Sequence, residues 1–464
     1  MDIFFLRRIS VEYNFDTTPV KKLVWQLGVP AMLAQLFNIL YSIVDRIYIG
    51  HMASGAEIAL ASIGICSPAF TAITGFASLV GVGGAALMSI SLGEKNHDAA
   101  QHSMNNSVLL LIICSVIVTT ALLLFKRPFL YLLGCSDTMY QTANIYFTIY
   151  SLGTGAVLCG TGLNRFIMGQ GYARQGMMSV VIGALLNIAL DPVFIYALDM
   201  GVAGAALATV ISQFGVLFYV LVVLNHHSMP IRIGFGQYSI AVCLKILSIG
   251  SMSLFIIVLD NLLIILLNVM LRKYGGSLGD QYISYAAVVQ SVMVVAICPA
   301  EGLTSGCSTL FSYYYGSGRH SRIVDSFRYV LIYTGLYLGV LTLAILAVPE
   351  VFVRLFLNNP SSVAQTAVFA RRYCIGFAFV AIQFAFVDGF TAMGMVREAI
   401  PISFFRKSLY VIAILLLPRF LPLEYIFYAC PISDGVGSMF TLAMYFLILK
   451  KRLATVMLQH SECK

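Results

Sequence analysis

The sequence predicts an all-α membrane protein in which twelve transmembrane helices form two six-helix bundles related by a pseudo-two-fold axis. Three observations lead to this fold class: an apolar composition, twelve long apolar segments and an internal repeat. Hydrophobic residues make up 59% of the 464 residues, charged residues make up only 10%, and the mean hydropathy is +0.90. A water-soluble globular protein carries roughly 25% charged residues. The composition therefore excludes a soluble globule, a secreted disulfide scaffold and a disordered chain, and it makes the lipid bilayer the main solvent.

Twelve apolar segments are long enough to cross a membrane, since a transmembrane helix needs about 20 predominantly apolar residues. Polar connectors with turn residues separate them, and none of these connectors is long enough for a soluble domain. In the first half we expect spans over 23–48, 58–92, 103–125, 139–161, 175–197 and 202–224. In the second half we expect them over 240–271, 282–315, 324–348, 362–393, 399–417 and 425–449.

The expected organisation follows from these spans. A cytoplasmic N-terminal segment covers residues 1–22, and the apolar stretch that begins at Leu23 lacks the small-residue cleavage site of a signal peptide. The N-lobe covers 23–225, a cytoplasmic linker covers 226–239, the C-lobe covers 240–452, and a cytoplasmic tail covers 453–464. The even number of spans places both termini on one side of the membrane.

An internal repeat relates the two halves. Gly93, His97, Gly171 and Arg174 recur as Gly316, His320, Gly394 and Arg397, and the separation in the chain is the same for all four pairs. Each pair also lies between corresponding spans. One recurrence would be coincidence, but four at one separation, here called the repeat offset, indicate duplication of a six-span unit. Because six is even, the two halves run parallel, as in many secondary transporters.

The distribution of Lys and Arg sets the orientation. We assign 19 of the 28 to the face that holds both termini, including Arg406 and Lys407, and nine to the other face. The positive-inside rule then places both termini in the cytoplasm. The net charge of +8 needs no nucleic-acid partner.

Motifs of enzymes and metal sites are absent from the sequence. The ten cysteines form no CxxC pair, and the seven histidines form no HExxH-like spacing. The glycine-rich segment over 75–86 lacks the GK[ST] ending of a phosphate-binding loop, so we interpret it as close helix packing. We therefore expect neither an enzyme nor a cofactor nor a nucleotide-driven pump.

Acids inside membrane spans are the strongest functional signal, because a charge at mid-bilayer costs about 2.5–3.5 kcal/mol or more. Asp191 lies four residues after Asn187, on the same helical face, and directly before Pro192. Carboxylate, amide and freed carbonyl oxygens suit a hard monovalent cation, and a desolvated carboxylate can instead carry a proton. The structural alternative is that Asn187 and Asp191 cap the end of the helix. The acids at or inside the expected spans are Asp45, Asp191, Asp260, Glu301, Asp388 and Asp434.

Tyr41 and Asp45 repeat this four-residue spacing on the first span and again share one helical face. If Asp45 and Asp191 converge, two like charges in a low dielectric must share a cation or a proton. Such sharing is the coupling device that an antiporter needs.

Several segments together resemble the multidrug and toxic compound extrusion (MATE) transporters, over essentially the whole chain. They are Pro30 through Asp45, the Gly83-Gly84 to Gly93 exit from the second span, residues 164–174, the segment Asn187-Ile-Ala-Leu-Asp191-Pro-Val-Phe-Ile195, and residues 201–206. The Asn187–Ile195 segment looks most like the branch of the family that keeps its coupling acids in the N-lobe.

The resemblance implies two six-helix bundles around a central V-shaped cleft, and it implies roles for individual residues. An ion site, for H+ or Na+, would be formed by Asp45, Asn187, Asp191 and Thr209. Tyr41, Tyr146 and Asn164 would line the N-lobe cavity. The sequence departs from that branch in the C-lobe, where Asp260, Glu301 and Asp388 form a second candidate site.

We therefore expect a cation-coupled antiporter that exports amphipathic, cationic small molecules by alternating access, with H+ or Na+ as the coupling ion and no other cofactor. The implied partners are the lipid bilayer and an organic cation, and the protein is expected to be a monomer in a bacterial inner membrane. A lipid-precursor flippase of the same superfamily is the alternative; such proteins tend to carry cationic cavity residues and extra spans. A major-facilitator transporter and a channel fit the loops and the paired acids less well.

Overall fold

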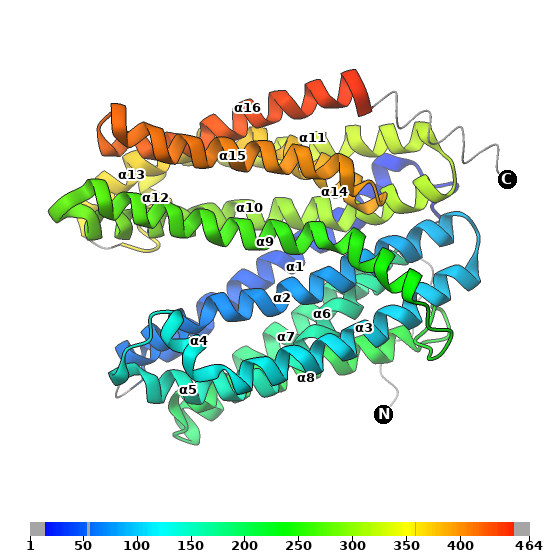
Figure 1. Ribbon diagram of the computed structural model, residues 1–464, viewed down its shortest axis with the longest axis horizontal. Coiled ribbons are helices and arrows are strands. Elements are labelled where there is room, and N and C mark those ends of the chain that lie inside the picture. The colour runs from blue at the N-terminus through cyan, green and yellow to red at the C-terminus, as the bar shows by residue number, and fades with distance from the viewer. Residues whose placement is uncertain (1–13, 53–55, 358, 450–464) are drawn as a thin grey trace. The chain divides into compact units, whose positions relative to one another are not determined.

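The computed structural model describes residues 14–52, 56–357 and 359–449, and every regular element in these residues is a helix (Figure 1). The first half contains α1 (Val20–Gly50), α2 (Ala56–Gly93), α3 (His97–Leu124), α4 (Lys126–Leu132), α5 (Asp137–Leu152), α6 (Thr154–Gly169), α7 (Ala173–Pro192), the π-helix η1 (Val193–Ala197) and α8 (Gly201–Leu224). The second half contains α9 (Ile240–Gly275), η2 (Gly276–Leu278), α10 (Gly279–Gly316), α11 (His320–Ala347), α12 (Pro349–Val353), α13 (Pro360–Cys374), α14 (Phe377–Ala392), α15 (Val396–Phe420), η3 (Leu423–Tyr428), α16 (Ala429–Met444) and η4 (Tyr445–Leu449).

Most of the predicted spans correspond to single long helices. Within the described residues, nine helices are long and apolar enough to cross a bilayer, and the pair α13 and α14, bent by 44°, adds a tenth. The two remaining predicted spans correspond to α5 with α6 and to α16 with η4. The span predicted over 139–161 ends too early, because α6 continues beyond the break at Gly153 as far as Gly169.

The internal repeat extends to the boundaries of the helices. Gly93 and Gly316 end α2 and α10, whereas His97 and His320 begin α3 and α11. Gly171 and Gly394 have φ values of +91° and +73° in the turns before α7 and α15, a backbone conformation that glycine adopts without strain. The same repeat offset separates the starts of α2 and α10, α4 and α12, α5 and α13, α6 and α14, and α7 and α15.

The chain forms two compact units. Unit 1 contains residues 1–18 and 33–257, and unit 2 contains residues 19–32 and 258–464. Within unit 1, α2 packs against α3, α5 and α6; within unit 2, the equivalent helix α10 packs against α11, α13 and α14. The unit boundary lies within α9, between Ile257 and Val258, whereas the sequence places the start of the C-lobe at 240.

The first half of α9 belongs to unit 1 because two glycines allow it to cross α2 closely. A Cβ at Gly83 would lie 2.1 Å from the Ile246 carbonyl oxygen, and a Cβ at Gly250 would lie 1.7 Å from the Leu79 carbonyl oxygen. The connector before α9 is also attached to unit 1. Asn106 donates a hydrogen bond to the Gln237 carbonyl oxygen and accepts one from the Ser239 amide.

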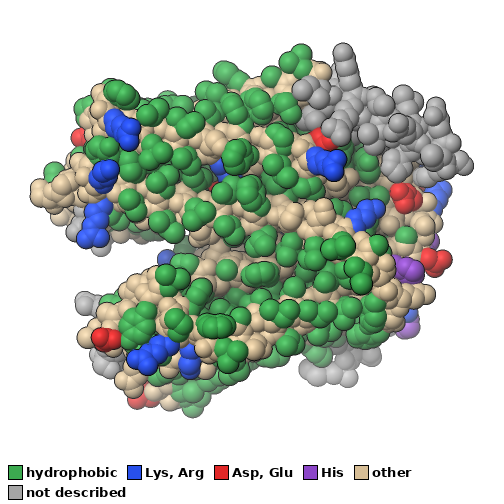
Figure 2. Space-filling model, viewed as in Figure 1, with side chains coloured by type: hydrophobic (Ala, Val, Ile, Leu, Met, Phe, Trp, Pro, Cys, Tyr) green, Lys and Arg blue, Asp and Glu red, His purple; other side chains and the backbone are tan. Residues whose placement is uncertain are grey.

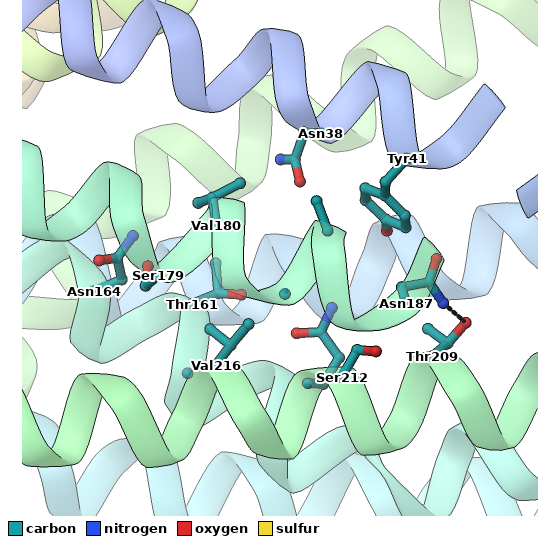
Figure 3. A pocket seen from close by; sticks show the side chains of 14 residues that line it. Asn38, Tyr41, Thr161, Asn164, Ser179, Val180, Asn187, Thr209, Ser212 and Val216 are labelled. Carbon is teal, nitrogen blue, oxygen red and sulfur yellow. Dashed lines mark hydrogen bonds between the residues drawn. The ribbon is translucent and has the colours of Figure 1, made fainter. Parts of the chain in front are cut away.

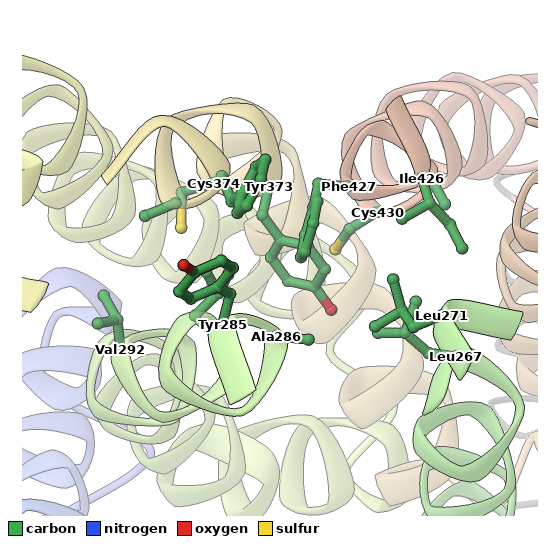
Figure 4. Packing of buried hydrophobic residues seen from close by; sticks show 14 of the residues in the cluster. Leu267, Leu271, Tyr285, Ala286, Val292, Tyr373, Cys374, Ile426, Phe427 and Cys430 are labelled. Carbon is green, nitrogen blue, oxygen red and sulfur yellow. The ribbon is translucent and has the colours of Figure 1, made fainter. Parts of the chain in front are cut away.

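Aromatic side chains form much of the core of unit 2 (Figure 4). The rings of Phe369 and Phe427 stack with centroids 4.5 Å apart, and Tyr285 packs against Phe369 with centroids 5.8 Å apart. Tyr373 and Cys430 belong to the same cluster and border the cavity described below. Packed aromatic rings contribute about 0.5–1.5 kcal/mol per pair beyond the burial of their area, so these contacts stabilise the cluster behind this wall of the cavity.

The outer surface is apolar. On α3, Ile112, Ile113, Val116 and Ile117 are all exposed, and their spacing places them on one side of the helix. Hydrophobic side chains cover most of the face in Figure 2, and most of its Lys and Arg side chains lie toward the helix ends. Exposed apolar surface of this extent is rare on soluble proteins and is the surface that lipid chains require.

Candidate functional site

Two side chains of α7 and one of α8 form a hydrogen-bonded group in the interior of unit 1. The Asn187 amide nitrogen lies 3.2 Å from Asp191 Oδ1 and 3.4 Å from Thr209 Oγ1. Asp191 is fully buried, and Asn187 and Thr209 are 2% and 6% exposed. Thr209 in turn donates a hydrogen bond to the Ala205 carbonyl oxygen at 3.0 Å. The amide thus connects the carboxylate to the hydroxyl and orients both.

Pro192 changes the helix directly after Asp191. Because proline has no backbone N–H, the hydrogen-bond ladder shifts, and residues Val193–Ala197 form a π-helix in which the Leu198 amide donates to the Val193 carbonyl oxygen at 2.9 Å. Insertions of this kind occur frequently at functional sites. The local sequence therefore places a buried carboxylate at a break in the regular helix.

Asp45 approaches this group from α1. It is 9% exposed, and its charge acts on Asp191; the charges of both acids act on the Tyr41 hydroxyl. Asp45 also acts on Tyr146. The structure thus brings Tyr41, Asp45, Asp191 and Tyr146 into one electrostatic environment inside unit 1.

Three buried oxygens of this group have no hydrogen-bond partner among the described residues: Asp45 Oδ1, Asn187 Oδ1 and Asp191 Oδ2. Buried polar atoms in native proteins are nearly always paired, so each exception needs an explanation. Oxygen ligands of this type suit a hard cation, and either carboxylate can alternatively hold a proton. No group of three or more His, Cys, Asp or Glu side chains in the described part of the chain could hold a metal ion. The two carboxylates and the Asn187 amide oxygen are thus the groups of this site that can hold a small cation or a proton.

A cavity of about 110 Å³ adjoins the group (Figure 3). Four of the residues predicted for the site border it, namely Tyr41, Asn164, Asn187 and Thr209. Asp45, Asp191 and Tyr146 do not border this cavity. The Tyr146 side chain instead packs between aromatic rings, with its centroid 5.7 Å from that of Phe70.

The cavity has further polar walls that the sequence interpretation missed. Asn38 precedes Tyr41 by three residues on α1, and Ser179 precedes Asn187 by eight on α7, so each lies on the same helical side as a predicted residue. A search for polar residues at helical spacings before Tyr41 and Asn187 would have found Asn38 and Ser179. Ser212 and Gln213 border the cavity from α8.

In unit 2, the three candidate acids make different contacts. Asp260 on α9 forms an ion pair with Lys407 on α15 and borders a separate cavity. Asp388 on α14 accepts a hydrogen bond from Thr304 on α10 at 2.6 Å. Glu301 is exposed on α10, and its charge acts on Lys407. Neither Asp388 nor Glu301 borders the cavity.

Two cations in unit 2 correct the sequence interpretation. Arg406 and Lys407 were counted with the charges of the cytoplasmic face, but they lie inside α15, where Lys407 is 3% exposed. Arg406 forms a 2.8 Å ion pair with Asp434, which is fully buried. The count of Lys and Arg on that face therefore falls from 19 to 17. Unit 2 thus has cationic cavity residues, the feature that the flippase alternative tends to carry. The sequence signal that could have revealed the burial of these two cations was the presence of acids in neighbouring spans, because a buried carboxylate needs a cationic partner.

The family assignment rests on a match to the family described as MatE, which covers residues 30–193 and again residues 257–416. The chain belongs to the MatE family. The two matched regions lie one in each half, in agreement with the internal repeat. As expected for this family of transporters, the protein is not an enzyme.

Relatives and solved structures of the family resemble the chain over nearly its full length. It is 23% identical over 440 residues to the multidrug export protein MepA of Staphylococcus aureus strain N315, covering 94% of this chain and 96% of that protein. It is 22% identical over 447 residues to MepA of Staphylococcus haemolyticus, covering 96% and 97%.

Among solved structures, an outward-facing multidrug resistance MATE transporter of the MOP superfamily aligns with a TM-score of 0.87 at 20% identity, covering 95% of this chain and 98% of that one. A MOP superfamily transporter from Pyrococcus furiosus, described as having a binding pocket of reverse polarity that suggests a different function, aligns with a TM-score of 0.87 at 21% identity, covering 95% and 98%. These alignments confirm the predicted fold class, an integral membrane protein with the all-helical MATE transporter fold.

Proposed function

We propose that this MatE protein is a multidrug exporter driven by antiport of H+ or Na+, and that the group around Asp191 is its coupling site. The observation that carries the proposal is the set of buried oxygens without partners on Asp45, Asn187 and Asp191. Two carboxylates within each other's field repel when both are ionised, and a bound cation or proton removes this repulsion. Occupancy of the site thus changes the relative stability of the conformations that unit 1 can adopt.

In an alternating-access cycle, this site would couple ion binding to export of the substrate. Binding of the ion on the outer side would favour one conformation, and binding of a substrate from the cytoplasm would favour the other. An amphipathic organic cation competes with the ion for the same negative charge, and the Tyr41 side chain and the polar cavity wall lie next to that charge. The relatives named as multidrug export proteins support this class of substrate. We further propose that the protein acts as a monomer in the inner membrane of a bacterium, with both termini in the cytoplasm.

The N-lobe branch of the family is favoured over C-lobe coupling by the pairing of the acids. In unit 2, Asp260 and Asp434 form ion pairs with Lys407 and Arg406, whereas no ion pair of the described chain includes Asp45 or Asp191, and the neighbouring Arg46 acts on Asp45 without direct contact. An acid that is already paired binds an additional ion weakly. The coupling ion is therefore expected in unit 1.

The proposal is tested with purified protein in liposomes that contain a fluorescent organic cation such as rhodamine 6G. A pH gradient and a sodium gradient are imposed separately, with the membrane potential clamped. Export that follows at least one gradient is the expected result. Equal movement of the dye without any gradient would contradict antiport, and gradient-independent translocation of a lipid-linked pyrophosphate in the same liposomes would support the flippase alternative instead.

A further inference from the structure

A second cavity, of about 120 Å³, lies inside unit 2 and is the counterpart of the cavity in unit 1. Ile264, Arg406, Lys407 and Tyr410 border it. The residues one repeat offset earlier in the chain are Tyr41, Gly183, Ala184 and Asn187, and all four border the unit 1 cavity. Because the starts of α7 and α15 are separated by the same offset, these positions are in the same helical register. The duplication therefore produced two equivalent cavities, one in each unit.

The two cavities differ in charge: no charged side chain of the described residues borders the unit 1 cavity, which adjoins the acids Asp45 and Asp191, whereas charged side chains border the unit 2 cavity. The positions in unit 2 that correspond to Asp45 and Asp191 hold Asn268 and Ile414, so the acids of the coupling group are missing there. In place of the small Gly183 and Ala184, unit 2 has the cations Arg406 and Lys407. Of the charged side chains that border the unit 2 cavity, two are cations and one, Asp260, is an anion.

The two ion pairs at this cavity differ in how easily the cation can exchange its anionic partner for another anion. Arg406 is held by Asp434, whose side chain is 1% exposed and which also accepts a hydrogen bond from Cys430 at 3.3 Å. In the other pair the Lys407 side chain is 4% exposed, but the Asp260 side chain is 49% exposed. Removing the partner of a buried charge is strongly destabilising, so the Lys407 ammonium must keep an anion. Asp260 can turn toward water once another anion takes its place.

The remaining walls of the cavity suit an aromatic, amphipathic molecule. The hydroxyls of Tyr373 and Tyr410 lie 3.4 Å apart, and both residues belong to the buried hydrophobic cluster of unit 2. Met293 borders the cavity from α10 with a flexible, polarisable side chain that adapts to varied shapes. Tyrosine and methionine side chains bind apolar rings, whereas the ammonium requires a negative group.

We propose that the unit 2 cavity is a binding subsite for the carboxylate of an amphipathic aromatic molecule, which replaces the Asp260 carboxylate on the Lys407 ammonium. One carboxylate leaves and one arrives, so the buried ammonium is paired throughout. Glu301, whose charge also acts on Lys407, lies outside the cavity and stays in place. The substrate range therefore includes carboxylates in addition to the organic cations assigned to unit 1.

The subsite is part of the proposed exporter, but its test needs no transport. Purified full-length protein in nanodiscs is titrated with 2-aminobenzoate, a fluorescent single-ring carboxylate of a size that suits the cavity, and with 2-aminobenzamide, its neutral counterpart of nearly equal shape. Charge-assisted hydrogen bonds contribute more than neutral ones, so we expect the acid to bind about tenfold more tightly than the amide. Failure of ion coupling in liposomes would leave this result unchanged, and failure here would leave the coupling site unchanged.

Variants with opposite expected signs make the test specific. Lys407→Gln should remove the preference for the acid without altering amide binding, and Lys407→Arg should retain most of it. Asp260→Asn should strengthen binding of the acid several-fold, because the internal competitor is gone. Lys273→Gln, which removes the same charge from an exposed position at the end of α9, is the matched control and should change neither affinity.

Three results would overturn the proposal. The first is equal binding of acid and amide by the wild-type protein, a measurement that requires no variant to fold. The second is an equal loss of both affinities in Lys407→Gln, which would indicate a packing role. The third is weaker binding of the acid in Asp260→Asn, which would assign Asp260 itself to the ligand.

Discussion

The side-chain nitrogen of Asn187 lies within hydrogen-bonding distance of both Asp191 Oδ1, at 3.2 Å, and Thr209 Oγ1, at 3.4 Å. This single amide connects α7 to α8, while its own oxygen has no partner in the described residues. The Asn187 oxygen and the second oxygen of Asp191 are therefore available to a ligand, and their positions are set by the same contact. The expected effects of substituting Asp191 and Asp45 follow from this arrangement.

Asp191→Asn should abolish gradient-driven export while the protein remains folded. The substitution keeps the hydrogen-bonding shape but removes the negative charge that holds the cation or proton. Export in liposomes under the effective gradient is the measurement. Asp199→Asn is the control, since it makes the same change in an exposed turn with a φ of 51°, a conformation that asparagine tolerates. Normal coupled export by Asp191→Asn would reduce Asp191 to a structural residue.

Asp45→Asn and Asp191→Asn should not have additive effects on export. If the two acids share one ion, either substitution removes it, and the double variant should resemble the more defective single variant. The rates of the two singles and the double are compared at fixed sodium concentration and pH. Asp260 lies in the other unit. The effect of Asp260→Asn on the export rate should therefore add to that of either substitution, or Asp260→Asn should change only the choice of substrate. Additivity of Asp45 and Asp191 would mean two separate sites, and a larger loss from Asp260→Asn would move the coupling site to unit 2.

Gly83→Ala should destabilise unit 1. The new Cβ would lie 2.1 Å from the Ile246 carbonyl oxygen, and a helix backbone cannot move aside as a flexible side chain can. We expect a cost of about 1–3 kcal/mol, measured as a lower thermal unfolding temperature in detergent. Gly339→Ala on α11 is the control, because a Cβ there meets nothing within 4 Å. Equal unfolding temperatures for the two variants would mean that α2 and α9 do not cross this closely.

Arg406→Gln should be strongly destabilising, and a second substitution should restore most of the loss. The single variant leaves the fully buried Asp434 carboxylate without its cation, which costs about 3–5 kcal/mol. Arg406→Gln combined with Asp434→Asn replaces the ion pair by neutral amides. Thermal unfolding of both variants tests this double-mutant cycle. A double variant no more stable than Arg406→Gln would show that Asp434 is not the group that the arginine neutralises.

A tag fused after Lys464 should be accessible only from the cytoplasm. Even after Arg406 and Lys407 are removed from the count, the sequence assigns 17 Lys and Arg residues to the face of the termini and nine to the other. The tag residues follow a segment outside the described part of the chain, so this prediction depends on the positive-inside rule alone. Labelling of the tag from outside intact cells would show that the assigned orientation is wrong.

The sequence predicted those parts of the molecule that depend on order along the chain. Apolar length determines which segments can span a bilayer, because each residue of a helix adds a fixed rise. The repeat offset, read from four pairs of residues such as Gly93 and Gly316, recurs in the boundaries of the helices. The spacing of Asn187 and Asp191 also predicted their contact, since residues four apart on a helix lie on one face.

Other features required the tertiary structure because they depend on which side chains of distant helices face one another. The sequence contains Lys407 beside Arg406, but only the fold pairs Lys407 with Asp260, 147 residues away, and buries it. The separation of Tyr146 from the unit 1 cavity and the unit boundary within α9 have the same origin. The sequence by itself thus determined a duplicated, all-helical membrane transporter. It also determined that Asp45 and Asp191 each share a helical face with a polar residue four positions earlier. The tertiary structure alone decided that the unit 1 cavity has an uncharged polar lining beside two buried acids, whereas its duplicate is lined by two cations and one acid, because packing determines which charges are buried and paired.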